Sequence, residues 1–214
     1  MIWLVFAWTV LGALVGAVVA WSTPRLERLE GLEASAPSRR NFQRWGPVAL
    51  VAVFYLAFSL KLGFGLPLWL DSLWAAVLTQ VIFFDLRHHL ILDRVLLPAY
   101  VLALIAAFFV PHLGVVTALI AAVVAGGAFL LLALVGRAIF KADALGLGDV
   151  KFAVLMGLIL GAGTFDAVLI GMVLAGVASI AVIASRRRGL RDSIAYGPFL
   201  ALGTIVVLYQ LGGG

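Results

Sequence analysis

Two aspartates, Asp85 and Asp149, lie at the ends of hydrophobic stretches of the sequence. An ionised aspartate costs about 2.5–3.5 kcal/mol at the centre of a membrane-spanning helix and less near its edge. A chain that keeps two carboxylates at such positions is expected to use them. Two carboxylates that meet can catalyse aspartyl proteolysis, in which one acts as a general base and the other as a general acid.

Each aspartate also has a structural interpretation. Asp149 follows Gly146 and Gly148, which allow a backbone or a substrate strand to approach the carboxylate closely. The alternative for Asp149 is a helix N-cap, a role compatible with catalysis. For Asp85 the alternative is an interfacial ion pair with Arg87 or Arg94.

The composition predicts that a membrane positions these residues. Of the 214 residues, 64% are hydrophobic and 12% are charged, and the mean hydropathy is +1.19. Soluble domains average roughly 45–50% apolar and about 25% charged residues. We expect a single all-α domain over residues 1–214, a polytopic bundle in the lipid bilayer of the cytoplasmic (inner) membrane. The first apolar stretch lacks a preceding basic segment, so we interpret it as a retained span rather than a cleaved signal.

Eight apolar segments approach the length of about 20 residues that a spanning helix needs, although some are short. Pro and Gly residues separate them, including Pro111, Gly161 and Gly163. The predicted spans are 2–21, 47–62, 68–84, 95–110, 114–136, 150–163, 166–184 and 195–211.

The basic residues orient this predicted topology. Fourteen of the fifteen Lys and Arg residues fall in odd-numbered loops, and only Lys61 falls in an even-numbered one. Cytoplasmic loops carry the excess of Lys and Arg, so both termini are predicted to lie outside. The same rule puts Asp85 and Asp149 at one membrane edge, the cytoplasmic one. The high pI therefore indicates membrane orientation, and no nucleic-acid partner is predicted.

The other polar residues are given structural roles. The loop over residues 22–46 is predicted to form a short surface helix and a solvated turn that docks on anionic lipid. Solvated loop positions are expected for Asp93, Asp143 and Asp192, with Asp93 a candidate support for the site, whereas Asp71 and Asp166 are predicted on the outer side. Cysteine is absent, and the adjacent His88 and His89 lack further ligands, so we predict no metal and no cofactor.

Together these residues resemble the type IV prepilin peptidases, intramembrane aspartyl proteases of the GxGD kind. The string Gly-Leu-Gly-Asp-Val-Lys at 146–151 matches the family's second aspartate segment, and 85–93 resembles its first. Residues 196–203, with Gly197, Pro198 and Phe199, resemble its C-terminal Gly-Pro-Phe stretch, and Gly12 to Gly16 loosely resembles its opening helix. The resemblance implies catalytic Asp85 and Asp149, with Gly146, Gly148, Lys151 and the Gly-Pro-Phe residues in support.

The resemblance also implies a substrate, a type IV prepilin-like precursor whose basic leader is cut at the cytoplasmic membrane face. The pilus, secretion and competence systems use such precursors. Two departures stand out: Leu92 replaces the family's usual Pro, and the segment 22–46 is short and lacks the paired CxxC motifs of long members. Those motifs are linked to N-methylation, so we expect an endopeptidase without N-methyltransferase activity.

Two alternatives remain open. Presenilin-type proteases also carry Leu-Gly-Leu-Gly-Asp, which this chain has at 145–149, but their later Pro-Ala-Leu motif is absent here. A non-enzymatic membrane scaffold or transporter could also keep two acids at a membrane edge. The sequence contains no inverted repeat of interrupted spans that would favour a transporter. Separate Asp85→Asn and Asp149→Asn substitutions distinguish a protease from a scaffold.

Overall fold

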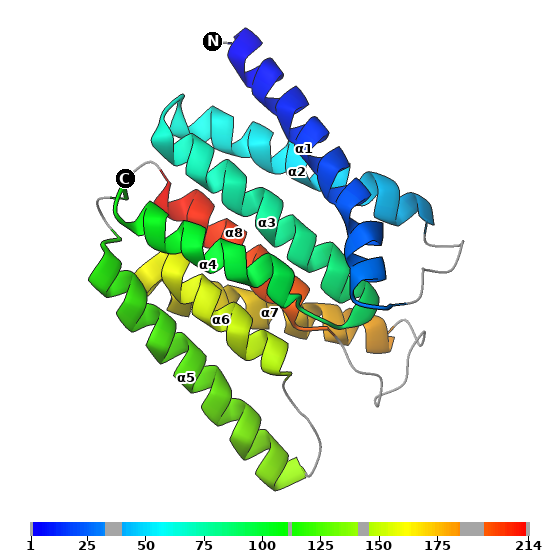
Figure 1. The fold of residues 1–214 in the computed structure, drawn as a ribbon, viewed down its shortest axis with the longest axis vertical. Coiled ribbons are helices and arrows are strands. Elements are labelled where there is room, and N and C mark those ends of the chain that lie inside the picture. Colours follow the sequence, from blue (N-terminus) through cyan, green and yellow to red (C-terminus); the bar gives the residue numbers. More distant parts are fainter. Residues whose placement is uncertain (1, 33–39, 111–112, 141–145, 185–194, 213–214) are drawn as a thin grey trace. The chain divides into compact units, whose positions relative to one another are not determined.

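The computed structural model of the chain describes residues 2–32, 40–110, 113–140, 146–184 and 195–212 (Figure 1). All regular structure in these residues is helical, in eight α-helices and one short 3₁₀ helix. The prediction of an all-α protein is therefore confirmed. The chain forms two compact units, residues 1–88 with 208–214 and residues 89–207, and each is described by itself.

The first unit contains three long helices, α1 (Ile2–Leu29), α2 (Arg40–Leu62) and α3 (Leu66–His88). Helices α1 and α2 pack closely because glycines leave room for the neighbouring chain. A Cβ atom at Gly16 would lie 2.6 Å from the carbonyl oxygen of Pro47, and one at Gly12 would lie 2.7 Å from the Tyr55 side chain. This spacing of small residues is typical of close helix pairs in membranes.

Helix α3 is the most buried helix of the first unit. In its most apolar 18-residue window, 61% of the residues are buried, against 22% in α1 and 28% in α2. A helix surrounded by protein can carry polar side chains in the membrane if other protein groups bind them. Helix α3 carries several, including Gln80 and Asp85.

The second unit contains α4 (Asp93–Ala107), α5 (Val115–Phe140), α6 (Leu147–Leu160), η2 (Gly161–Gly163), α7 (Thr164–Ala184) and most of α8 (Gly197–Leu211). Glycine again sets the packing. A Cβ atom at Gly157 of α6 would overlap the backbone of Ala122 in α5, and one at Gly203 of α8 would overlap the Ala167 carbonyl oxygen in α7.

Five helical segments of the described residues are long and apolar enough to cross a membrane. One of them, Leu147–Val182, has 36 residues and includes both α6 and α7. A straight helix of that length would extend about 54 Å, well beyond the roughly 30 Å of a hydrocarbon core. The turn at Gly161, whose φ is +55°, separates the two helices where the glycines predicted a boundary. The count of eight spans and the outside termini stay predictions.

The largest difference from the sequence-based prediction lies in segment 22–46. Helix α1 continues through Pro24 to Leu29, and α2 begins at Arg40, so helix occupies both ends of the predicted loop. A proline inside a helix removes only one backbone donor, and in membrane helices neighbouring groups satisfy the carbonyl that is left. Residues 33–39, between the two helices, lie outside the described residues.

Candidate active site

Asp85 lies in the last turn of α3, and its residue is only 5% exposed. The helix extends to His88, four residues beyond the end of the predicted span. His89 then adopts a left-handed conformation, with φ +52°, that ends the helix. Asp85 therefore belongs to an ordered helix and not to the loop that follows.

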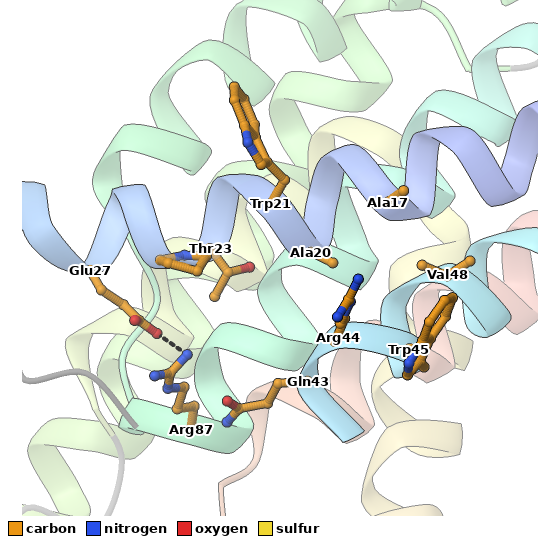
Figure 2. A pocket seen from close by; sticks show the side chains of 11 residues that line it. Ala17, Ala20, Trp21, Thr23, Glu27, Gln43, Arg44, Trp45, Val48 and Arg87 are labelled. Carbon is orange, nitrogen blue, oxygen red and sulfur yellow. Dashed lines mark ion pairs between the residues drawn. The ribbon is translucent and has the colours of Figure 1, made fainter. Parts of the chain in front are cut away.

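A glutamate from α1 binds the end of α3. Glu27 is 2% exposed, and one of its carboxylate oxygens, Oε1, lies against Arg87 Nη1 (Figure 2). The same oxygen lies 3.0 Å from His88 Nε2. The solvated interpretation of segment 22–46 is therefore wrong for Glu27. Of the two partners predicted for Asp85, Arg87 and Arg94, Arg87 pairs with Glu27. The helical spacing of α1 could have indicated that Glu27 is buried. Buried positions recur along one helix face from Trp8 to Thr23, and the next position in that series is Glu27.

A second polar contact joins the same two helices at Gln80, five residues before Asp85. The hydroxyl of Ser22 donates to Gln80 Oε1 at 2.9 Å, and Gln80 Nε2 donates to the hydroxyl of Thr23 at 3.1 Å. Contacts with α1 thus flank Asp85 along α3, at Gln80 and at Arg87 with His88. Buried polar networks of this kind specify one helix position and register.

Asp149 lies in the first turn of α6 as its third residue. The N-cap is Gly146, so the interpretation of Asp149 as the N-cap is wrong. The Asp149 backbone N–H donates to the Gly146 carbonyl oxygen at 3.1 Å, and its carboxylate is hydrogen-bonded by the Gly146 backbone. A Cβ atom at Gly146 would lie 3.7 Å from Asp149 Oδ2, so the carboxylate folds back over the glycine. Asp149 remains partly exposed to solvent.

The segment that follows Asp85 in the sequence packs on the beginning of α6. A Cβ atom at Gly148 would lie 3.3 Å from the Cβ atom of Ile91, a distance tighter than most contacts of real Cβ atoms. Glycine at position 148 therefore lets Ile91 lie directly against the residue before Asp149. Leu92, which replaces the family's usual proline, is the N-cap of α4 with an extended backbone.

An ion pair and a hydrogen bond extend this contact. Lys151 Nζ donates to both carboxylate oxygens of Asp93, at 2.7 and 2.8 Å, and the hydroxyl of Tyr100 donates to the Lys151 carbonyl oxygen at 2.8 Å. Asp93, the first residue of α4, is therefore bound to α6, the helix that contains Asp149. Both charged side chains are about half exposed, so the pair contributes at most about 1 kcal/mol of stability. Its effect is on the alignment of α4 with α6.

The Gly-Pro-Phe residues begin α8 within the second unit. Pro198 is in the first turn, where a proline costs no helical hydrogen bond, and the Phe199 N–H donates to the Tyr196 carbonyl oxygen at 3.1 Å. A Cβ atom at Gly171 of α7 would lie 3.0 Å from the Leu200 Cα atom. These contacts give the segment a packing role against α7.

The remaining sequence candidates are dispersed. Asp71 lies near the beginning of α3, beside Gly212, and Asp166 is exposed in the first turn of α7. Asp143 and Asp192 lie outside the described residues. Across the parts of the chain that the structure describes, no group of three His, Cys, Asp or Glu side chains is arranged to hold a metal ion. Asp85 belongs to the first unit and Asp149 to the second.

The sequence model of the type IV leader peptidase family matches residues 72–184, just over half of the chain. The chain belongs to the type IV leader peptidase family. The matched region contains both aspartate segments, 85–93 and 146–151. No curated protein matched the chain, and no solved structure matched it. The resemblance noted in the sequence is therefore confirmed, and the family supports a leader peptidase-like protease over a presenilin-like one.

Proposed function

We propose that this leader peptidase is an aspartyl endopeptidase that uses Asp85 and Asp149 as its catalytic pair. Its substrate is a type IV pilin-like precursor, whose basic leader it removes at the cytoplasmic face of the membrane. The observation that carries the proposal is the contact between the two aspartate segments, 85–93 and 146–151, in which Ile91 lies on Gly148 and Asp93 binds Lys151.

The covalent chain limits how far Asp85 can lie from that contact. Residues 85–88 are helical, with a rise of about 1.5 Å per residue, and the next three residues span at most about 3.6 Å each. The Cα atoms of Asp85 and Ile91 are therefore separated by no more than about 15 Å. Ile91 in turn contacts the residue before Asp149. This restraint supports a pairing of the two carboxylates.

The proposed reaction is the hydrolysis of one peptide bond. One carboxylate takes a proton from water as the water oxygen attacks the scissile carbonyl carbon, and the other gives its proton to the departing amine. Two carboxylates that lie side by side share one proton, because both cannot ionise easily, as in other aspartyl proteases. Helix ends suggest the roles: Asp149, at the positive N-terminal end of α6, suits the base, and Asp85, near the C-terminal end of α3, suits the acid.

The direct test is cleavage of a purified prepilin by Asp85→Asn and Asp149→Asn variants in detergent micelles. Each variant should lose at least about 100-fold in kcat/KM, because each removes a general acid or base. Asp166→Asn, which alters an exposed aspartate of α7, is the matched control and should cleave as the wild type does. Cleavage retained in either variant contradicts the proposal, and a wild-type protein that never cleaves favours the scaffold alternative.

We also propose that the enzyme leaves the new N-terminus unmethylated. The chain has no cysteine, and the segment between α1 and α2 has no paired CxxC motifs. Mass spectrometry of the cleaved product, after incubation with S-adenosylmethionine, should give the unmodified mass. A gain of one methyl group contradicts this part of the proposal.

A further inference from the structure

A crevice of about 530 Å³ opens in the first unit between the end of α1 and the beginning of α2 (Figure 2). It begins one residue beyond Gly16, where α1 lies close against the backbone of Pro47 and Val48 in α2. From there α1 presents the small side chains of Ala17 and Ala20, which leave the space between the helices unfilled. Val48 of α2 lines the same apolar end of the crevice.

The other end of the crevice is polar and rich in arginine. Arg87, Arg44 and Glu27 line it. Glu27 is bound by Arg87 Nη1 and His88, whereas Arg87 Nε is buried without a hydrogen-bond partner. The Arg87 side chain is only 10% exposed, and an unpaired donor at such a position is costly.

Arg44 adds an exposed cation to this end. In Figure 2 its side chain extends from α2 toward α1, and it lies 5.4 Å from the Trp45 ring centroid. Within the described residues, no carboxylate forms an ion pair with Arg44. Two arginines and one glutamate give the lining a net positive charge, so charge complementarity favours an anion.

Two tryptophans indicate the depth of the crevice in the membrane. Trp21 and Trp45 line it and are 58% and 59% exposed. Tryptophan is enriched at membrane–water interfaces. The guanidinium of Arg25 stacks 3.3 Å from the Trp21 ring centroid, which marks the same transition from apolar to charged residues along α1. The crevice therefore combines an apolar channel with a cationic end at the interface.

We propose that this crevice binds an acidic glycerophospholipid. The phosphate lies between Arg44 and the free donor of Arg87, and an acyl chain follows the channel beside Ala17 and Val48. A basic precursor leader is disfavoured there, because its positive charges would face the two arginines. The proposal concerns a lipid site within the first unit and does not depend on cleavage by Asp85 and Asp149.

Native mass spectrometry of the full-length protein, titrated with phosphatidylglycerol or phosphatidylcholine, tests the site. The wild type should retain phosphatidylglycerol more tightly than phosphatidylcholine. Arg44→Gln should weaken phosphatidylglycerol binding roughly fivefold and leave phosphatidylcholine unchanged, as expected for one arginine near an anionic headgroup. Ala17→Phe should weaken both lipids, because the new ring fills the channel.

Two matched controls lie on α1 outside the crevice. Arg28→Gln removes an exposed cation, and Val18→Phe adds the same ring at a 60% exposed position. Both should bind lipid as the wild type does. Equal retention of the two lipids by the wild type overturns the proposal, as does equal weakening in test and control variants. Displacement of phosphatidylglycerol by a soluble basic leader peptide also overturns it, because the crevice would then be a substrate site.

Discussion

At the scale of single residues, the burial of Glu27 and its contacts with Arg87 and His88 were not predicted from the sequence. Its partners, Arg87 and His88, are about sixty positions away, and local pattern cannot reveal a contact of that separation. What the sequence did contain was the helical spacing of the residues before it, which continues beyond the predicted span. The charged neighbours Arg25 and Arg28 masked that spacing, because they made the segment look uniformly solvated.

Glu27→Gln should destabilise the first unit. The amide keeps the shape of the side chain but leaves the Arg87 guanidinium without its carboxylate, at a cost of about 3 kcal/mol for a buried pair. Unfolding in mixed micelles with increasing SDS measures this loss. Glu30→Gln, the same change at the exposed residue that follows α1, should alter stability by less than about 0.5 kcal/mol.

The activity of the Glu27→Gln variant should fall as well, chiefly in kcat. Asp85 is two residues from Arg87, so release of the helix end misplaces the carboxylate, and small displacements of reacting groups are costly. An equally stable Glu27→Gln enzyme with unchanged kcat contradicts the positioning role of this residue.

At the scale of elements, the important contact is the one between segment 89–93 and α6. The motif Gly-Leu-Gly-Asp was predicted to permit close approach to the carboxylate, and the structure identifies what approaches at Gly148, namely Ile91. The prediction could name the glycine but not its partner, because the partner depends on how α4 packs beside α6. Likewise, the position of Asp149 within its helix differed by three residues from the predicted one, since helix ends are poorly marked in apolar sequence.

Gly148→Ala should reduce cleavage about tenfold with little change in KM, because the added methyl group pushes Ile91 and the attached segment by a few tenths of an ångström. Gly127→Ala in α5 is the control, since nothing lies within 4 Å of its Cβ position. That control should keep full activity and gain about 0.5–1 kcal/mol of stability from improved helix propensity. Steady-state kinetics with a prepilin substrate measures kcat and KM for both variants. A fully active Gly148→Ala enzyme would contradict the prediction that the contact between the aspartate segments 85–93 and 146–151 aligns the site.

At the scale of the whole molecule, composition alone was enough to predict an all-α membrane protein, and each predicted span overlaps one of the eight helices. The number of membrane crossings is a different matter. It depends on how short helices such as α6 and α8 are placed in a bilayer, and within the described residues five segments are long and apolar enough to cross one.

The predicted orientation can be tested because the chain contains no cysteine. Gly65 and Leu90 lie in the loops before and after α3, and both are exposed. Each can be replaced by a single cysteine. In intact cells a membrane-impermeant maleimide should label the Gly65→Cys protein and spare the Leu90→Cys protein. Labelling of position 90 from outside contradicts the assignment of that loop, and of Asp85 beside it, to the cytoplasmic edge.

The measurement that tests the central claim most directly is a cross-link between the two proposed catalytic positions. In the cysteine-free chain, an Asp85→Cys/Asp149→Cys double variant in native membranes should be joined efficiently by a short bifunctional methanethiosulfonate. Asp85→Cys/Asp166→Cys should remain unjoined under the same conditions. If both cysteines of the first variant react singly with a monofunctional reagent and yet never become linked, the two carboxylates do not meet and the aspartyl protease mechanism is wrong.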